Sequence, residues 1–114
     1  MIKIKRIYNK PEREDGFRIL VDRLWPRGLS KERAKVDLWL KDVAPSDKLR
    51  TWFSHDPKKW DDFKSKYNNE LRDTTELTNK VKQIEKEKKI VTLLYSAKDE
   101  KHNNAVVLKK ILQK

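Results

Sequence analysis

The chain lacks cysteine altogether and has only two glycines among its 114 residues. Without cysteine, disulfide bonds, thiolate zinc sites and cysteine nucleophiles are all excluded. No apolar run approaches the roughly 20 residues that a helix needs to cross a bilayer. The N-terminal segment MIKIKRIY alternates apolar and basic side chains, whereas a signal peptide needs a continuous apolar run. We therefore expect a cytoplasmic protein with no membrane partner.

Side chains that bind metals and cofactors are also scarce. Two histidines and no cysteine leave little for a transition metal to bind. The two glycines form neither a Walker-type phosphate loop nor a dinucleotide fingerprint. The sequence therefore predicts no metal and no cofactor. With no internal repeat and no flexible linker, residues 1–114 are expected to form a single domain.

Positive charge is abundant and unevenly distributed. The formal net charge is +11; residues 1–35 hold 11 basic and 5 acidic side chains, and residues 80–114 hold 10 and 4. If the two ends meet in one sheet, they form a basic face that attracts phosphates or nucleic acid. The alternative is an ordinary solvated surface, because lysines outnumber arginines 21 to 8.

Three segments are predicted to form strands of one sheet. Residues 2–7 alternate in polarity, as in a half-buried strand near a sheet edge. Residues 17–21 and 90–94 are nearly continuously apolar, as in strands that are covered on both faces. Residues 36–43 alternate in a way that favours an extended segment, and a helix is the alternative.

Helices are predicted from N-caps and from apolar spacing. Ser30, Ser46 and Asp56 are suitable N-caps, and Asp56 is followed by a proline at the first helical position. The next segment carries an apolar stripe at steps of three and four, formed by Trp60, Phe63, Tyr67 and Leu71.

Two more helices complete the predicted fold. One is expected to begin at Thr74 or Thr75, and the last is expected to end near Leu112. The order of elements favours an α/β fold, with a small mixed or parallel sheet of about three to four strands flanked by about four to five helices.

The polar segment after residues 17–21 is the first candidate site, because ligands usually bind at the carboxyl ends of strands in open α/β sheets. Asp22 and Arg23 follow the strand directly, and Arg27 lies four residues beyond Arg23. Two guanidinium groups near a carboxylate and the indole of Trp25 would form an anion clamp. The alternative is an internal salt bridge, with Trp25 packed in the core.

The loop before the last predicted helix is the second candidate site. Lys98 supplies a point charge, and the start of the helix offers free N–H groups that favour an anion. Asp99 and Asn103 are further candidate ligand-binding residues, and His102 is a candidate catalytic acid or base together with Asp22. The alternative is that Asp99 caps the helix, while His102 and Asn103 lie at the surface or bind backbone groups.

A third segment holds His55 next to Asp56, which invites a catalytic pairing. Adjacent side chains rarely face each other usefully, however, and Asp56 is better explained as a helix cap.

Four stretches of the sequence resemble the motifs of the YeaO-like family of small bacterial proteins. They are residues 16–31, with DRLWPRG at 22–28, residues 39–46, residues 49–60 and residues 93–103. The resemblance covers about residues 2–112 and leaves residues 73–89 without a recognisable motif. It implies a bacterial, cytoplasmic, single-domain α/β protein. The family is one of unknown function, so it lends no catalytic residues.

Three functions fit these features. The first is a binder of, or an enzyme acting on, a small anionic ligand, phosphate-bearing or nucleotide-like, held by Arg23, Arg27 and Lys98. The second is a nucleic-acid-binding accessory protein that uses the basic face. The third is a non-catalytic interaction protein. The oligomeric state is left open.

Overall fold

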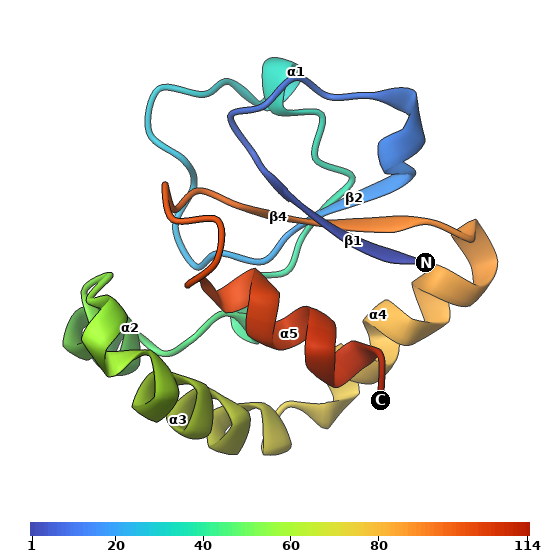
Figure 1. The fold of residues 1–114 in the computed structure, drawn as a ribbon. Coiled ribbons are helices and arrows are strands. Elements are labelled where there is room, and N and C mark those ends of the chain that lie inside the picture. The colour runs from blue at the N-terminus through green and yellow to red at the C-terminus, as the bar shows by residue number, and fades with distance from the viewer.

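A parallel four-stranded sheet lies at the centre of the computed structural model, which describes residues 1–114 (Figure 1). The strands lie in the order β1-β4-β2-β3, and all three neighbouring pairs are parallel. Their bounds are β1 (Ile2–Arg6), β2 (Phe17–Leu20), β3 (Leu38–Trp39) and β4 (Val91–Tyr95). The predicted α/β fold is confirmed, and the sheet is parallel rather than mixed.

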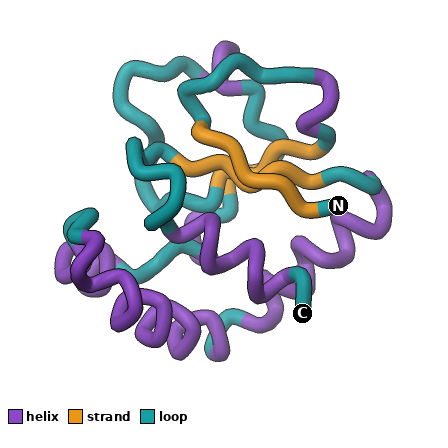
Figure 2. The backbone as a smooth tube through the Cα atoms, in the orientation of Figure 1, coloured by secondary structure: helices purple, strands orange, loops and turns teal.

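Helices cover one face of this sheet, and loops cover most of the other. The helices are α1 (Lys31–Ala34), α2 (Asp47–Phe53), α3 (Trp60–Arg72), α4 (Thr75–Lys88) and α5 (Asn104–Leu112), and short 3-10 turns are η1 (Arg13–Asp15), η2 (Lys41–Val43) and η3 (Pro57–Lys59). Helices α2 to α5 lie on one side of the sheet, whereas α1 and two long loops lie on the other (Figures 1 and 2). None of the helices is long and apolar enough to span a membrane.

The two inner strands are the two that the sequence predicts to be covered on both faces. Every residue of β4 is buried, and so are the last three residues of β2. The predicted edge strand is also confirmed, because β1 pairs only with β4 and is half-buried along most of its length. The pairing of β1 with β4 brings the two basic ends of the chain together.

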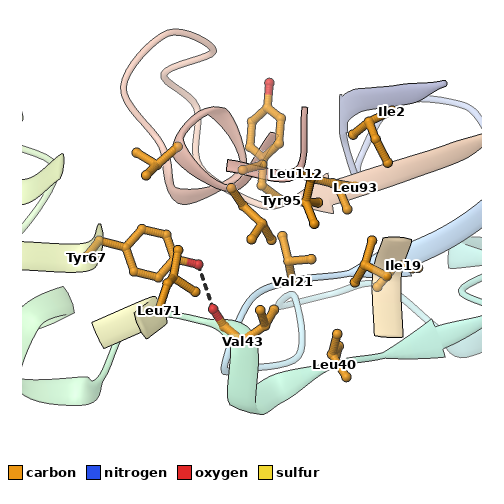
Figure 3. Close-up of a cluster of buried hydrophobic side chains, with 14 of the residues drawn as sticks. Ile2, Ile19, Val21, Leu40, Val43, Tyr67, Leu71, Leu93, Tyr95 and Leu112 are labelled. Carbon is orange, nitrogen blue, oxygen red and sulfur yellow. Dashed lines mark hydrogen bonds between the residues drawn. The ribbon is translucent and has the colours of Figure 1, made fainter. Parts of the chain in front are cut away.

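The main core lies between the sheet and helices α2 to α5. The apolar stripe predicted for α3 faces this core, and Tyr67 in the stripe is fully buried. Its hydroxyl donates a 2.6 Å hydrogen bond to the carbonyl oxygen of Val43, at the end of η2 (Figure 3). A smaller cluster on the opposite face includes Leu20 and Leu94 and is covered by Trp25 and Trp39.

The predicted N-caps are confirmed. Ser30 and Ser46 each accept a hydrogen bond from the backbone N–H three residues later, at 3.2 and 3.1 Å. Asp56 caps the turn η3, which leads into α3. The ambiguous segment 36–43 contains both kinds of structure, since a two-residue strand, β3, is followed by the 3-10 turn η2.

Candidate functional site

A pocket of about 160 Å³ opens at the carboxyl ends of β2 and β4. The two strands are neighbours in the sheet, so the segments that follow them lie close enough to form one site. The segment after β2, the loop after β4, the start of α5 and the α2 region all contribute to its walls. The pocket wall contains one acidic and two basic side chains, an imidazole and two amides: Asp22, Arg23, Arg50, His55, Asn103 and Asn104.

Asp22 joins the two halves of the site. Its carboxylate accepts hydrogen bonds from the backbone N–H of Ser96 at 2.9 Å and from the Ser96 hydroxyl at 2.7 Å. The side-chain amide of Asn104 donates to its other oxygen at 3.2 Å. Burial raises the pKa of the Asp22 carboxyl, and the hydrogen bonds from Ser96 and Asn104 oppose this shift. The carboxylate therefore ties β2 to the loop after β4 and lies in the pocket wall.

Arg23 does not pair with Asp22. Its Nε and Nη2 atoms donate to the carbonyl oxygens of Pro45 and Ala44, at 3.2 and 3.3 Å. These bonds fix the direction of the guanidinium group. The remaining nitrogen, Nη1, has only the carboxylate of Asp42 nearby, at 4.0 Å. The proposed internal salt bridge between Asp22 and Arg23 is therefore not what the structure contains.

Arg50, which the sequence does not mark as a site residue, and His55, whose pairing with Asp56 is not expected, both line the pocket. Arg50 lies on α2, where nothing in the helical pattern marks it as different from other exposed charges. His55 follows α2 in a turn in which Ser54 and His55 both have positive φ values, 44° and 57°. That turn reverses the chain and directs His55 toward the pocket, while Asp56 caps η3 as predicted. Backbone geometry of this kind is not readable from the residue types.

Four of the predicted ligand-binding residues lie outside the pocket walls: Trp25, Arg27, Lys98 and Asp99. Trp25 packs edge-on against Trp39 with 5.4 Å between ring centroids, and its indole N–H donates to the carbonyl of Leu29. Arg27 and Lys98 are exposed. The structure therefore places Trp25 in the smaller apolar cluster, and Arg27 and Lys98 at the surface.

The remaining predicted residues form a compact turn before α5. Asp99 accepts from the Lys101 and His102 N–H groups and from the His102 ring at 2.9 Å; these bonds lower the pKa of its carboxyl. The His102 ring lies edge-on to Trp60 and does not line the pocket. Asp99 is not the cap of α5, because Asn103 accepts from the N–H of Val106 instead.

Asn103 is the one member of this turn that also lines the pocket. Its amide nitrogen donates to the carbonyl of Asp99 at 3.0 Å, so both ends of the side chain are already occupied within the protein. No group of three histidine or carboxylate side chains in the structure is placed to hold a metal ion. The pocket wall contains one carboxylate, that of Asp22, and apolar side chains such as Phe53 and Phe63 lie beside its polar groups.

The family model described as "Inactive DUF488-N3 subclade" matches residues 1–114. The chain belongs to this family. It is 42% identical over 107 residues to the uncharacterized protein YeaO of Escherichia coli, a match that covers 94% of this chain and 92% of that protein.

Relatives outside Escherichia coli cover the same extent of the chain. Uncharacterized proteins of Mycobacterium bovis and Mycobacterium tuberculosis are 37% identical over 111 residues, 97% of this chain and 92% of each relative. No solved structure matches the chain. The resemblance to a YeaO-like bacterial family is thereby confirmed, and the family is one of unknown function.

Proposed function

We propose that the chain binds a small anionic ligand in the pocket at the carboxyl ends of β2 and β4. The observation that carries the proposal is that Arg23, Arg50 and His55 line one small pocket. Arginine presents a planar fork of donors that matches phosphate and carboxylate oxygens. The net charge of +11 also favours the approach of anions from solution.

The two guanidinium groups retain donors for a ligand. Arg23 is held through Nε and Nη2, which leaves Nη1 without a hydrogen bond. Arg50 has one partner, Asp47, at 3.3 Å, and both of these side chains are about half exposed or more. An exposed ion pair of this kind contributes at most about 1 kcal/mol, so an incoming anion displaces Asp47 at little cost.

The size of the pocket restricts the ligand. Pockets for drug-sized molecules usually measure about 300–1,000 Å³. A cavity of about 150 Å³ holds one benzene molecule, which has six heavy atoms. At about 160 Å³, the pocket therefore encloses a phosphate or carboxylate group with a short carbon skeleton rather than a complete dinucleotide.

Binding without turnover is the favoured form of this function. The family to which the chain belongs is described as inactive. The two candidate proton carriers also do not share a site, because Asp22 lines the pocket whereas His102 packs on Trp60 outside it. Arg27 and Lys98 are exposed outside the pocket, where their positive charges would attract the ligand. Replacement of either residue should therefore weaken binding less than replacement of Arg50.

Calorimetric titration with propyl phosphate tests this proposal directly. Arg50→Ala should weaken binding about tenfold or more, the usual effect of losing a charge-assisted hydrogen bond. Arg72→Ala is the matched control, because Arg72 is an exposed arginine on α3 outside the pocket. The proposal is wrong if neither propyl phosphate nor propionate binds, or if both variants weaken binding equally.

Nucleic-acid binding is the second candidate, and one observation favours it. Because β1 pairs with β4, the basic ends of the chain, residues 1–35 and 80–114, meet in the sheet. Such a basic surface would bind polyanions through their phosphates, regardless of sequence.

A further inference from the structure

The carboxylate of Asp22 has acceptor capacity that the protein does not use. A carboxylate has about four lone-pair sites for hydrogen bonds. Ser96 donates twice to Oδ2, at 2.9 and 2.7 Å. Oδ1 receives only the 3.2 Å bond from Asn104, whose amide nitrogen lies closer to the carbonyl oxygen of Val21, at 2.9 Å. Oδ1 is thus the acceptor left for another donor.

The partners of this carboxylate are all neutral. Ser96 and Asn104 supply every hydrogen bond that it accepts, and no lysine or arginine forms an ion pair with it. A partly buried carboxylate without a cationic partner costs free energy unless further donors reach it. Burial raises the pKa of the Asp22 carboxyl for the same reason, because it disfavours the charged form. A hydrogen-bond donor on a ligand would reduce this free-energy cost.

The same small pocket also holds the cationic groups of Arg23 and Arg50 and the imidazole of His55. A bare anion would satisfy these groups but would be repelled by Asp22. A ligand that carries a hydroxyl or amino group close to its anionic group would satisfy both sides. The volume of about 160 Å³ allows only a few bonds between the two groups.

We infer that the ligand is a small organic phosphate whose hydroxyl or amino group lies a few bonds from the phosphate and donates to Asp22 Oδ1. This inference rests on the proposed function, because it assumes that the cationic groups hold the phosphate. Asp22 is therefore the residue that selects among anions, while the arginines supply the general affinity for them.

Three probes of similar size separate the possibilities. Propyl phosphate has no donor on its carbon chain, glycerol 3-phosphate has hydroxyl groups, and phosphoethanolamine has an ammonium group. We expect the wild-type chain to bind at least one of the two donor-bearing probes about tenfold more tightly than propyl phosphate, as one hydrogen bond to a charged group allows. The preferred probe identifies whether the donor is a hydroxyl or an ammonium group.

The variant Asp22→Asn should remove this preference and leave the affinity for propyl phosphate the same or higher. The ratio of two affinities is measured on the same folded sample, so a loss of stability does not imitate a loss of preference. Asp61→Asn is the control, because Asp61 is an exposed carboxylate on α3 outside the pocket; the variant makes the same change of side chain and should retain the preference.

The outcomes keep the two proposals apart. If no probe binds, the proposed function itself fails. If propyl phosphate binds as tightly as the other two probes, or if Asp22→Asn keeps the preference, anion binding stands and the inference about the ligand is overturned.

Discussion

Tyrosine hydroxyls illustrate how burial decides the contribution of a single hydrogen bond. Tyr67 donates to the carbonyl of Val43 at 2.6 Å from a fully buried position. Tyr8 donates to the carbonyl of Arg27 at 2.8 Å, but its side chain is 40% exposed. Water can replace the second bond when the hydroxyl is removed, and it cannot reach the first.

Tyr67→Phe should therefore destabilise the fold by about 1–3 kcal/mol, since it leaves a buried carbonyl oxygen without a donor. Tyr8→Phe should cost less than about 0.5 kcal/mol, as exposed substitutions usually do. Urea unfolding, followed by circular dichroism, measures both differences. Equal costs for the two variants would show that the bond from Tyr67 is not the source of the stability.

Residue by residue, the candidate site could be predicted from the sequence only in part. Asp22 and Arg23 follow a buried strand, and the rule that ligands bind at strand ends is enough to place them at the pocket. Trp25 and Arg27 lie in the same segment but turn away from it, and the residue types do not show this. His55 reaches the pocket only because two consecutive residues adopt positive φ, which no sequence pattern required.

Among the elements, β2 and β4 are in close contact at their amino ends, where Gly16 lies against Ile90. Gly16 has φ 64° and ψ −135°, and a Cβ atom there would lie 2.4 Å from the carbonyl oxygen of Ile90. That oxygen accepts the N–H of Phe17 at 2.9 Å, so it cannot retreat without breaking the contact between the strands. Gly28 also has a positive φ, 77°, but no atom lies within 4 Å of its added Cβ.

The two glycines therefore form a matched pair for a test. Gly28→Ala should cost about 1–2 kcal/mol, the usual penalty for a side chain in left-handed backbone. Gly16→Ala should cost at least about 3 kcal/mol, because steric overlap with Ile90 adds to the backbone strain. Thermal unfolding of both variants measures the difference. A Gly16→Ala protein as stable as Gly28→Ala would contradict the close approach of β2 and β4.

The elements also show where periodicity stops being informative. The long stripe of α3 and the continuous apolar runs of β2 and β4 contain enough residues to indicate their structure. Residues 36–43 do not, because only Leu38 and Trp39 pair with β2 before the chain turns into η2. The alternation in these eight residues does not show that the strand is only two residues long. The length of β3 is set by its pairing with β2 rather than by local preference.

For the whole molecule, the net charge of +11 and the small pocket should respond differently to salt. Binding of nucleic acid through surface lysines releases counterions, so its affinity falls steeply as the salt concentration rises. Charges within a partly enclosed pocket are screened less than exposed ones. The two candidate functions can therefore be separated in one chain by a salt titration.

We expect any association with single- or double-stranded nucleic acid to weaken by at least about tenfold between 50 and 200 mM salt, with no preference for sequence. Binding of propyl phosphate should weaken much less over the same range, because part of its affinity comes from hydrogen bonds to guanidinium groups, and that of Arg23 is held in place by the protein. Arg50→Ala should impair phosphate binding and leave nucleic-acid binding nearly unchanged, since it removes one charge from many. Fluorescence anisotropy with a labelled oligonucleotide and calorimetry with propyl phosphate measure the two affinities. If Arg50→Ala abolishes both, the nucleic acid binds through the pocket, and the separation between a ligand site and a basic surface is wrong.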